Sequence, residues 1–129
     1  MRLGLLLAGA LLSSLAVAPA TAQEKGPVVS PAQAARLLDK RVVLQMEVKS
    51  TGGSLNCYLN SAVDFKDAAN FAVFIPQAAL DKFKQARIEN PKAYYKGKTV
   101  QVSGTVTLYD EKPQIRVDEP AQIKVVERK

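Results

Sequence analysis

The chain has 129 residues, a formal net charge of +6, no histidine and one cysteine. The absence of histidine excludes imidazole-based acid–base catalysis and imidazole metal ligands, and a single cysteine excludes an intramolecular disulfide and a multi-thiolate zinc site. The excess of cations favours either polyanionic partners or solubility alone, because the lysines and arginines are dispersed along the chain.

The first 22 residues predict a secretory signal peptide. Arg2 gives a short positive region, residues 3–18 form a mainly apolar run, and the small residues 20–22 form a cleavage site. We expect cleavage after Ala22 and export to the periplasm or the medium. The alternative is a permanent membrane anchor, but a spanning helix needs roughly 20 apolar residues and this run is shorter. We therefore expect no stable membrane span in the mature protein.

The next segment predicts a tether followed by a short helix. Residues 23–29 predict a flexible tether, because they begin with polar residues and contain a Gly-Pro pair. The folded domain is expected over residues 30–129. Ser30 is a favourable N-cap, Pro31 suits the first helical position, and residues 32–38 contain good helix formers. We therefore expect a short N-terminal helix before the first strand.

From residue 42 onward, apolar side chains recur at every second position, which is the period of a half-buried β-strand. Residues 42–48 predict a first strand, residues 50–54 a flexible turn, and residues 55–60 a second strand that forms a hairpin with the first. The side chains expected to point inward are Val42, Leu44, Met46, Val48, Leu55, Cys57 and Leu59. Residues 71–75 are apolar throughout and predict a third strand that is covered on both faces.

Cys57 lies between Leu55 and Leu59 in the second predicted strand. This position predicts a small, buried, apolar side chain. The alternative is an accessible thiol that pairs between two chains, because unpaired cysteines of exported proteins can do so.

A helix and a link follow the third strand. Residues 77–88 predict an amphipathic helix whose apolar face carries Ala79, Leu80, Phe83 and Ala86. Residues 89–96 predict a link. Residues 92–98 are the densest basic and aromatic stretch, and we expect one of their two tyrosines to pack on the sheet while the lysines are exposed.

The strongest predicted strand covers residues 99–109 and places Val100, Val102, Val106 and Leu108 on one side. Gly104 interrupts that side and predicts a bend or bulge, which a small barrel needs in order to close. Residues 109–113 predict a turn, and residues 114–117 and 121–126 predict two shorter strands.

This order of elements predicts a mainly β fold: a five-stranded OB-fold Greek-key barrel, with a helix between strands three and four and a short N-terminal helix. The alternative is a ferredoxin-like sandwich, which fits less well because it needs two helices distributed between strands.

Several segments also carry a family resemblance. They are Gly97–Tyr109, Lys112–Ile115 and Pro120–Ile123, with Leu59-Asn60 and Asn70–Ile75. This pattern resembles bacterial OB-fold domains of the nucleic-acid-binding-like group over roughly residues 42–126. Residues 30–44 are similar, more weakly, to the opening of exported OB-fold proteins of the stress-tolerance type. The resemblance implies the fold and a nucleic-acid ligand, and it carries over no catalytic residue.

The candidate binding residues follow from this fold. OB barrels commonly bind polymers on strands two and three and on the loops joining strands one to two and four to five. Carried onto this sequence, the surface comprises Lys49, Asn56, Tyr58, Asn60, Tyr109, Lys112 and Arg116. The tyrosines can stack on bases or sugars, and the cations can meet phosphates. The alternative is that the tyrosines only cover the barrel and the cations are solvated, because nucleic-acid surfaces usually carry denser basic and aromatic residues.

No catalytic constellation is present in the sequence. The carboxylate pairs Asp64/Asp67, Asp110/Glu111 and Asp118/Glu119 all lie in predicted turns, where aspartate forms local hydrogen bonds. We therefore expect a non-enzymatic binding module without cofactor or metal, whose partner is single-stranded nucleic acid or another anionic polymer. The alternatives are a cell-envelope protein partner and a small-ligand or cation-binding stress protein.

Overall fold

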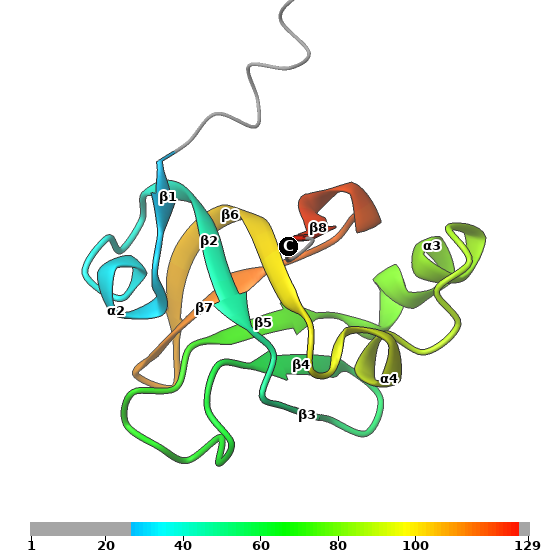
Figure 1. Cartoon of the computed structure of the whole chain (residues 1–129), viewed down its shortest axis with the longest axis horizontal. Coiled ribbons are helices and arrows are strands. Elements are labelled where there is room, and N and C mark those ends of the chain that lie inside the picture. Colours follow the sequence, from blue (N-terminus) through cyan, green and yellow to red (C-terminus); the bar gives the residue numbers. More distant parts are fainter. Residues whose placement is uncertain (1–26, 127–129) are drawn as a thin grey trace, which may run out of the picture.

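The computed structural model describes residues 27–126, which form one mixed sheet of eight strands with short helices around it (Figure 1). The predicted signal peptide, residues 1–22, lies outside the described residues, as do 23–26 and 127–129. The strands are β1 (Val28–Val29), β2 (Arg41–Glu47), β3 (Ser50–Gly52), β4 (Cys57–Asn60), β5 (Ala72–Ile75), β6 (Thr99–Tyr109), β7 (Lys112–Arg116) and β8 (Ile123–Val125). The helices are α2 (Pro31–Ala34), the 3₁₀ helix η2 (Gln77–Ala79), α3 (Leu80–Gln85), α4 (Pro91–Tyr95) and the 3₁₀ helix η3 (Pro120–Gln122). The prediction of a mainly β fold is confirmed.

The sheet runs in the order β1-β2-β6-β7-β5-β4-β3, and β8 pairs with β6. The pairs β1–β2 and β5–β7 are parallel, and the other pairs are antiparallel. The helices η2, α3 and α4 all lie between β5 and β6 in the chain. Within residues 27–126, none of the helices has the length and apolar composition that crossing a bilayer requires.

The chain joins the sheet earlier than predicted. Strand β1 pairs in parallel with Val43 and Leu44 of β2, so the predicted tether 23–29 is wrong for its last two residues. The Val43 N–H also donates to the Pro27 carbonyl at 3.0 Å. This pairing satisfies backbone groups on an edge of β2 that would otherwise face solvent, and it places Val29 in the core.

The first predicted hairpin is formed by different residues. The Val48 N–H donates to the Lys98 carbonyl beside β6, whereas the next N–H, that of Lys49, donates to the Asn60 carbonyl of β4. The backbone therefore changes partners between these two residues, and Ser50–Gly52, predicted as a turn, is the strand β3 that pairs with β4. The hairpin joins β3 to β4 rather than residues 42–48 to residues 55–60.

Strand β6 is the longest and lies between β2 on one edge and β7 and β8 on the other. Gly104 stands opposite Val42, and a Cβ atom there would lie 2.5 Å from Ile115 Cγ2. Glycine is needed because β6 and the Ile115 side chain approach so closely. Beside it, the Gln122 side-chain amide donates to the carbonyls of Ser103 at 2.9 Å and Arg116 at 3.2 Å, which ties β6 to the end of β7.

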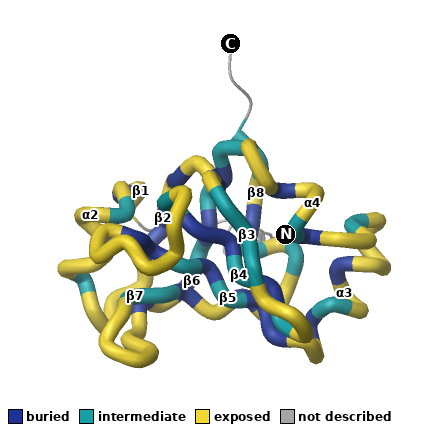
Figure 2. Tube along the Cα trace, turned by 90° about the horizontal axis from the view of Figure 1, so that it is seen from below, coloured by how far each residue is buried: buried dark blue, intermediate teal, exposed yellow. Residues whose placement is uncertain are grey.

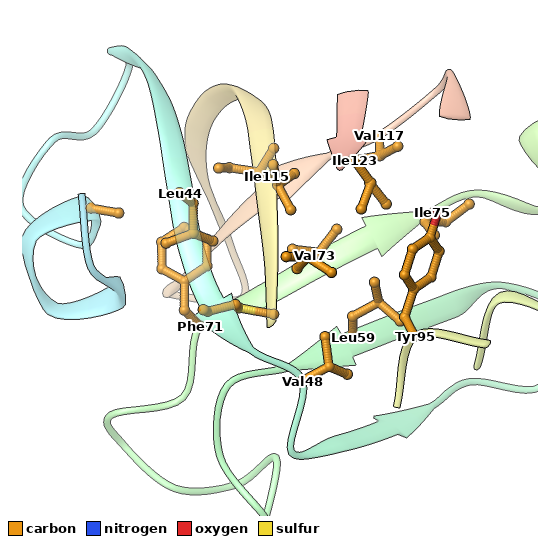
Figure 3. Packing of buried hydrophobic residues seen from close by; sticks show 14 of the residues in the cluster. Leu44, Val48, Leu59, Phe71, Val73, Ile75, Tyr95, Ile115, Val117 and Ile123 are labelled. Carbon is orange, nitrogen blue, oxygen red and sulfur yellow. The ribbon is translucent and has the colours of Figure 1, made fainter. Parts of the chain in front are cut away.

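Side chains from β2, β4, β5, β6 and β7 meet inside the curved sheet and form the core (Figure 3). Buried positions are concentrated in the central strands and exposed positions in the loops (Figure 2). The predicted inward residues are confirmed except for Leu55 and Leu108, which are exposed. Val43 is buried as well, although the two-residue period places it on the face opposite Val42 and Leu44. Strand β5 is covered fully on one face only, since Ala72 and Phe74 are half-buried.

The helices differ from the predictions mainly in length. In α2 the predicted N-cap is confirmed: the Ser30 hydroxyl accepts from the Gln33 N–H at 3.2 Å, but the helix ends at Ala34 rather than residue 38. Asp39, with φ of 66°, turns the chain toward β6, where its N–H donates to the Val106 carbonyl at 2.7 Å. This pairing with β6 competes with continuation of the helix.

The predicted helix over residues 77–88 is shorter, as η2 and α3, and Ala86 on its predicted apolar face is exposed. The predicted link 89–96 contains the helix α4. Its N-cap is Asn90, whose side-chain oxygen accepts from the Lys92 N–H at 3.1 Å. Tyr95 is fully buried and Tyr94 is partly exposed, which confirms that one of the two tyrosines packs on the sheet.

Cys57 is buried, as its position in the alternating strand predicted. Burial raises the pKa of its thiol from 9.0 to about 12, against the opposing charge of Lys92. Burial, with Tyr94 and Cys57 nearby, also raises the pKa of the Tyr95 hydroxyl from 10.0 to about 12. Both groups therefore keep their protons in the folded protein at pH values where the unfolded chain loses them.

We expect the free energy of unfolding to fall as the pH rises from 9 toward 12. A group whose folded pKa is raised stabilises the fold fully below its unfolded pKa, and this contribution is lost as the pH rises through the folded pKa. The slope should approach about 1.4 kcal/mol per pH unit for each group. Urea unfolding across this range measures it. Above pH 10, where both groups contribute, the Cys57→Ala variant should lose about half of the slope, since one of two groups is removed, and an unchanged slope would contradict the assignment to Cys57.

Candidate binding cleft

A cleft of about 600 Å³ lies on the outer face of β4. Its walls come from the β3–β4 hairpin, the loop of residues 61–71 and the β6–β7 turn, and the last two lie at the same end of the molecule (Figure 1). The lining residues are Ser50, Thr51, Gly52, Gly53, Tyr58, Asn60, Val63, Asp64, Phe65, Asn70, Ala72, Tyr109, Asp110, Lys112, Pro113 and Gln114. We refer to this feature as the β4 cleft.

The alternation of β4 explains which side chains reach the cleft. Cys57 and Leu59 point into the core, so Tyr58 and Asn60 lie on the opposite face. Tyr58 pairs with Phe74 of β5, and their ring centroids are 5.1 Å apart. The Tyr58 ring is therefore supported from the neighbouring strand, which limits its movement on the floor of the cleft.

The loop of residues 61–71 is fixed to the sheet by a set of hydrogen bonds. The Ser50 hydroxyl donates to the Ala62 carbonyl at 2.7 Å, and the Ala62 N–H donates to Asn70 Oδ1 at 3.0 Å. Asn70 Nδ2 in turn donates to Asn60 Oδ1 at 3.2 Å. Asn60 and Asn70 are 4% and 6% exposed, so this network is nearly closed to solvent. It makes the loop a defined wall rather than a free segment.

The β3–β4 hairpin is also held in place. Gly53 has φ of 96°, in the left-handed region that favours glycine. Its carbonyl accepts a hydrogen bond from Lys92 Nζ of α4 at 2.7 Å. The helix that replaces the predicted link thus supports one rim of the cleft.

Exposed apolar and aromatic side chains lie along the other walls. Val63 and Phe65 on the loop are 78% and 59% exposed, and Tyr109 at the β6–β7 turn is 64% exposed. The turn is tight, because Asp110 and Glu111 both have positive φ, as the hairpin turn preferred between twisted strands requires. Together with Tyr58, these residues offer aromatic surfaces on the floor and on two walls.

The charges of the cleft are mixed. Its lining carries Lys112 against the carboxylates of Asp64 and Asp110. Asp64 also forms a local hydrogen bond, accepting from the Lys66 N–H at 2.9 Å, as was predicted for aspartates in turns. Recognition in this cleft must therefore depend on stacking and hydrogen bonding more than on net charge.

Of the seven predicted binding residues, the cleft brings together Tyr58, Asn60, Tyr109 and Lys112. The other three, Lys49, Asn56 and Arg116, lie outside it. The Asn56 side-chain oxygen accepts from the Gln77 N–H at 3.0 Å, and Lys49 lines a separate shallow depression beside Glu47.

Arg116 is engaged elsewhere. Its Nε donates to Asp118 Oδ1 at 3.0 Å, and its guanidinium lies 5.9 Å from the Phe74 ring centroid. The ion pair is exposed and offsets the charge that the prediction assigned to phosphate binding.

Sequence reasoning missed Val63 and Phe65. Both stand in the polar stretch between the second and third strands, where exposed apolar residues are unexpected. Their presence in such a loop is a signal that could have marked them as contact residues. Within residues 27–126, no three carboxylate or thiol side chains gather closely enough to hold a metal ion.

Neither a family model nor a curated protein matches the chain. Among solved structures, the OBody AM1L10 bound to hen egg-white lysozyme is 18% identical with a TM-score of 0.54, covering 81% of this chain and 96% of that one. The OBody AM3L09 bound to hen egg-white lysozyme is 17% identical with a TM-score of 0.54, covering 81% and 98%. The asparaginyl-tRNA synthetase of Pyrococcus horikoshii is 15% identical with a TM-score of 0.51, covering 77% of this chain but 23% of that one. These similarities concern the fold alone, and they fit a mainly β, OB-fold-like architecture.

Proposed function

We propose that this chain is an exported binding module of the bacterial OB-fold type that holds single-stranded nucleic acid in the β4 cleft. The observation that carries the proposal is the convergence of Tyr58, Phe65 and Tyr109 on one cleft whose floor also presents Asn60. Aromatic side chains stack on bases of any identity, at about 1–3 kcal/mol per base. The asparaginyl-tRNA synthetase among the similar structures is named for an RNA substrate, which supports the same ligand class.

The proposal includes a five-stranded barrel in which β2 and β3 act as two halves of one bent strand. The other strands are then β4, β5, β6 and β7, and β1 and β8 are additions. The pairings β3–β4, β4–β5, β5–β7, β7–β6 and β6–β2 support it, because they form a closed circuit once the two halves are joined. The helices α3 and α4 then lie between the third and fourth strands, as in a Greek-key OB barrel.

Binding to single-stranded DNA and RNA should be measurable and should depend moderately on salt. Each phosphate contact changes the slope of log K against log salt by about −0.7 for single strands. Fluorescence anisotropy with oligothymidylate and oligouridylate across a salt series measures this slope. Lys112→Ala should make the slope shallower by about 0.7, since Lys112 lines the cleft.

The matched control is Lys84→Ala, which removes the same charge from the exposed face of α3 and should leave the slope unchanged. Undetectable binding at low ionic strength, or binding independent of salt, would contradict the nucleic-acid proposal. Binding of oligosaccharides in place of both nucleic acids would assign the same cleft to a different polymer.

Export is tested separately. Expression of the full chain in a bacterium should yield a mature protein that begins at Gln23, because cleavage is expected after Ala22. N-terminal sequencing of the periplasmic and culture fractions checks this. Recovery of an intact chain starting at Met1 in the membrane fraction would instead indicate the permanent anchor.

A protein ligand is the second candidate. The exposed apolar side chains at the rim, Val63, Phe65 and Tyr109, favour it, and the OBodies of similar fold are described as bound to lysozyme. Capture of a stoichiometric envelope protein from nuclease-treated extract, lost in Phe65→Ala, would support this candidate over the first.

A further inference from the structure

We infer that Asn60 makes the β4 cleft selective for bases that present a carbonyl oxygen, so that thymine and uracil bind better than adenine. The inference rests on the proposed nucleic-acid function and adds a specificity-determining residue to it. It follows from the direction of the hydrogen bonds around Asn60 and from the burial of its side chain.

The hydrogen-bond network fixes which end of the Asn60 amide is free. The Ala62 backbone N–H can only donate, so the Asn70 atom that it contacts at 3.0 Å must be the carbonyl oxygen. The other end of the Asn70 amide is therefore Nδ2, a donor, and it donates to Asn60 Oδ1 at 3.2 Å. The oxygen of Asn60 is thus turned toward Asn70, which already donates to it, and its Nδ2 group is the end without a partner.

The free end belongs to a buried residue that lines the cleft. Asn60 is 4% exposed and lines the β4 cleft, and within residues 27–126 its Nδ2 donates to neither backbone nor side-chain oxygen. A buried donor without an acceptor is costly, and a ligand oxygen that accepts from it removes this cost. The cleft therefore favours a ligand that places an acceptor on its floor.

The position of Asn60 relative to Tyr58 brings a stacked base within reach. The two residues are two positions apart on one strand, so their side chains lie on the same face about 7 Å apart. A base stacked on the Tyr58 ring directs one edge toward Asn60. The Asn60 Nδ2 group can then donate a hydrogen bond to an acceptor on that edge of the base.

The contact discriminates because the unpartnered end of the Asn60 amide is a donor. A free asparagine amide recognises adenine by accepting from its N6 amino group and donating to N7. Here the Asn60 oxygen already accepts from Asn70 and is turned toward it, so an adenine that approaches the unpartnered end of the amide places its amino group against a donor. Thymine and uracil present O4 instead, which accepts from Nδ2 without a neighbouring amino group.

The experiment compares the affinities of the mature protein for oligothymidylate and oligodeoxyadenylate. We expect thymidylate to bind about five- to tenfold more tightly, the size of effect that a single base contact gives. Adenine strands also stack on themselves, so the informative quantity is the change of this affinity ratio between variants.

Asn60→Asp keeps the acceptor that Asn70 requires and replaces the free donor by a second acceptor oxygen. The affinity ratio should then shift at least about fivefold toward adenylate, whose amino group can donate to the new oxygen. The matched control is Asn56→Asp, which makes the same chemical change outside the cleft, where the oxygen accepts from the Gln77 N–H. It should leave the ratio unchanged, and an equal shift in both variants, or no shift in Asn60→Asp, would overturn the inference.

A second measurement needs no variant and stands even if Asn60→Asp fails to fold. Difluorotoluene has the same shape as thymine without the carbonyl acceptors. A strand in which it replaces thymine should lose the tighter binding to the wild-type protein that oligothymidylate shows relative to oligodeoxyadenylate. A retained preference would overturn the inference while leaving the binding function in place. Absence of binding to every oligonucleotide at low ionic strength would overturn both.

Discussion

Replacing Phe83 by alanine should lower the free energy of unfolding by about 3–5 kcal/mol, which is the usual cost of truncating a buried phenylalanine. Phe83 is fully buried, and its ring packs edge-on against Tyr95 of α4, with centroids 6.4 Å apart. It also anchors α3, whose six residues are too few to be stable without tertiary contacts. Urea unfolding followed by circular dichroism measures the loss.

The control for this variant is Phe65→Ala, which makes the same chemical change at the rim of the cleft. Phe65 is largely exposed and contributes nothing to the core, so stability should stay within about 0.5 kcal/mol of the wild type. Affinity for single-stranded DNA should instead fall by about 1–3 kcal/mol, the value of one stacked base. Comparable losses of stability in the two variants would contradict the assignment of one ring to the core and the other to the cleft.

The second large effect is expected at Gly104. An alanine there would place its Cβ 2.5 Å from Cγ2 of Ile115, which is fully buried and stiff because it is β-branched. One of the two strands must shift, at a cost of about 1–3 kcal/mol. The midpoint of urea unfolding measures this cost.

Gly52→Ala is the matched control for Gly104→Ala. Gly52 has ordinary φ, and a Cβ atom at this position has open space around it. This substitution should therefore change stability by less than about 0.5 kcal/mol. If Gly104→Ala were equally neutral, β6 could relax around the extra methyl group, and the close approach to Ile115 would not explain the glycine.

The strands could be predicted from the sequence because one face of each is buried. In residues 42–48 and 99–109 the two-residue period reflects the burial of one face of the strand. The structure has strands at these positions, as the period predicted. The period does not predict how far along each strand the inward face is covered by other parts of the protein. Leu55 and Leu108 continue the alternation, but they lie near turns where no other part of the sheet covers them, and both are exposed.

The helix α4 was missed although its start was marked. Asn90-Pro91 is the same combination of an N-cap and a first-turn proline as Ser30-Pro31, which was interpreted correctly. Five residues with two tyrosines and a lysine show too little periodicity for a helix to stand out. Burial of Tyr95 against Phe83, a contact from outside the segment, is what stabilises α4.

The candidate site could be predicted where it depends on the strands and not where it depends on loops. Tyr58, Asn60, Tyr109 and Lys112 were found because their places follow from the order of strands and turns. The loop of residues 61–71 has no period, and its path is set by contacts distant in sequence, such as the bond between Ser50 and Ala62.

Long polar side chains were the least predictable part of the site. Arg116 is neutralised by Asp118, which is only two residues away but was assigned to a separate turn. Asn56 is used to bind the backbone of Gln77 after β5. Such partners depend on side-chain conformation, which the strand pattern does not determine.

Within residues 27–126, the core cluster and the lining of the β4 cleft have no residue in common. Strand alternation causes this separation, since the side chains at odd and even positions of β4 point to opposite faces of the sheet. Substitutions at the exposed lining positions can therefore change what is recognised during divergence without weakening the scaffold. A library randomised at the exposed lining positions Val63, Phe65, Tyr109 and Lys112 should keep a high fraction of folded members, which makes this chain a suitable starting point for selecting new binders.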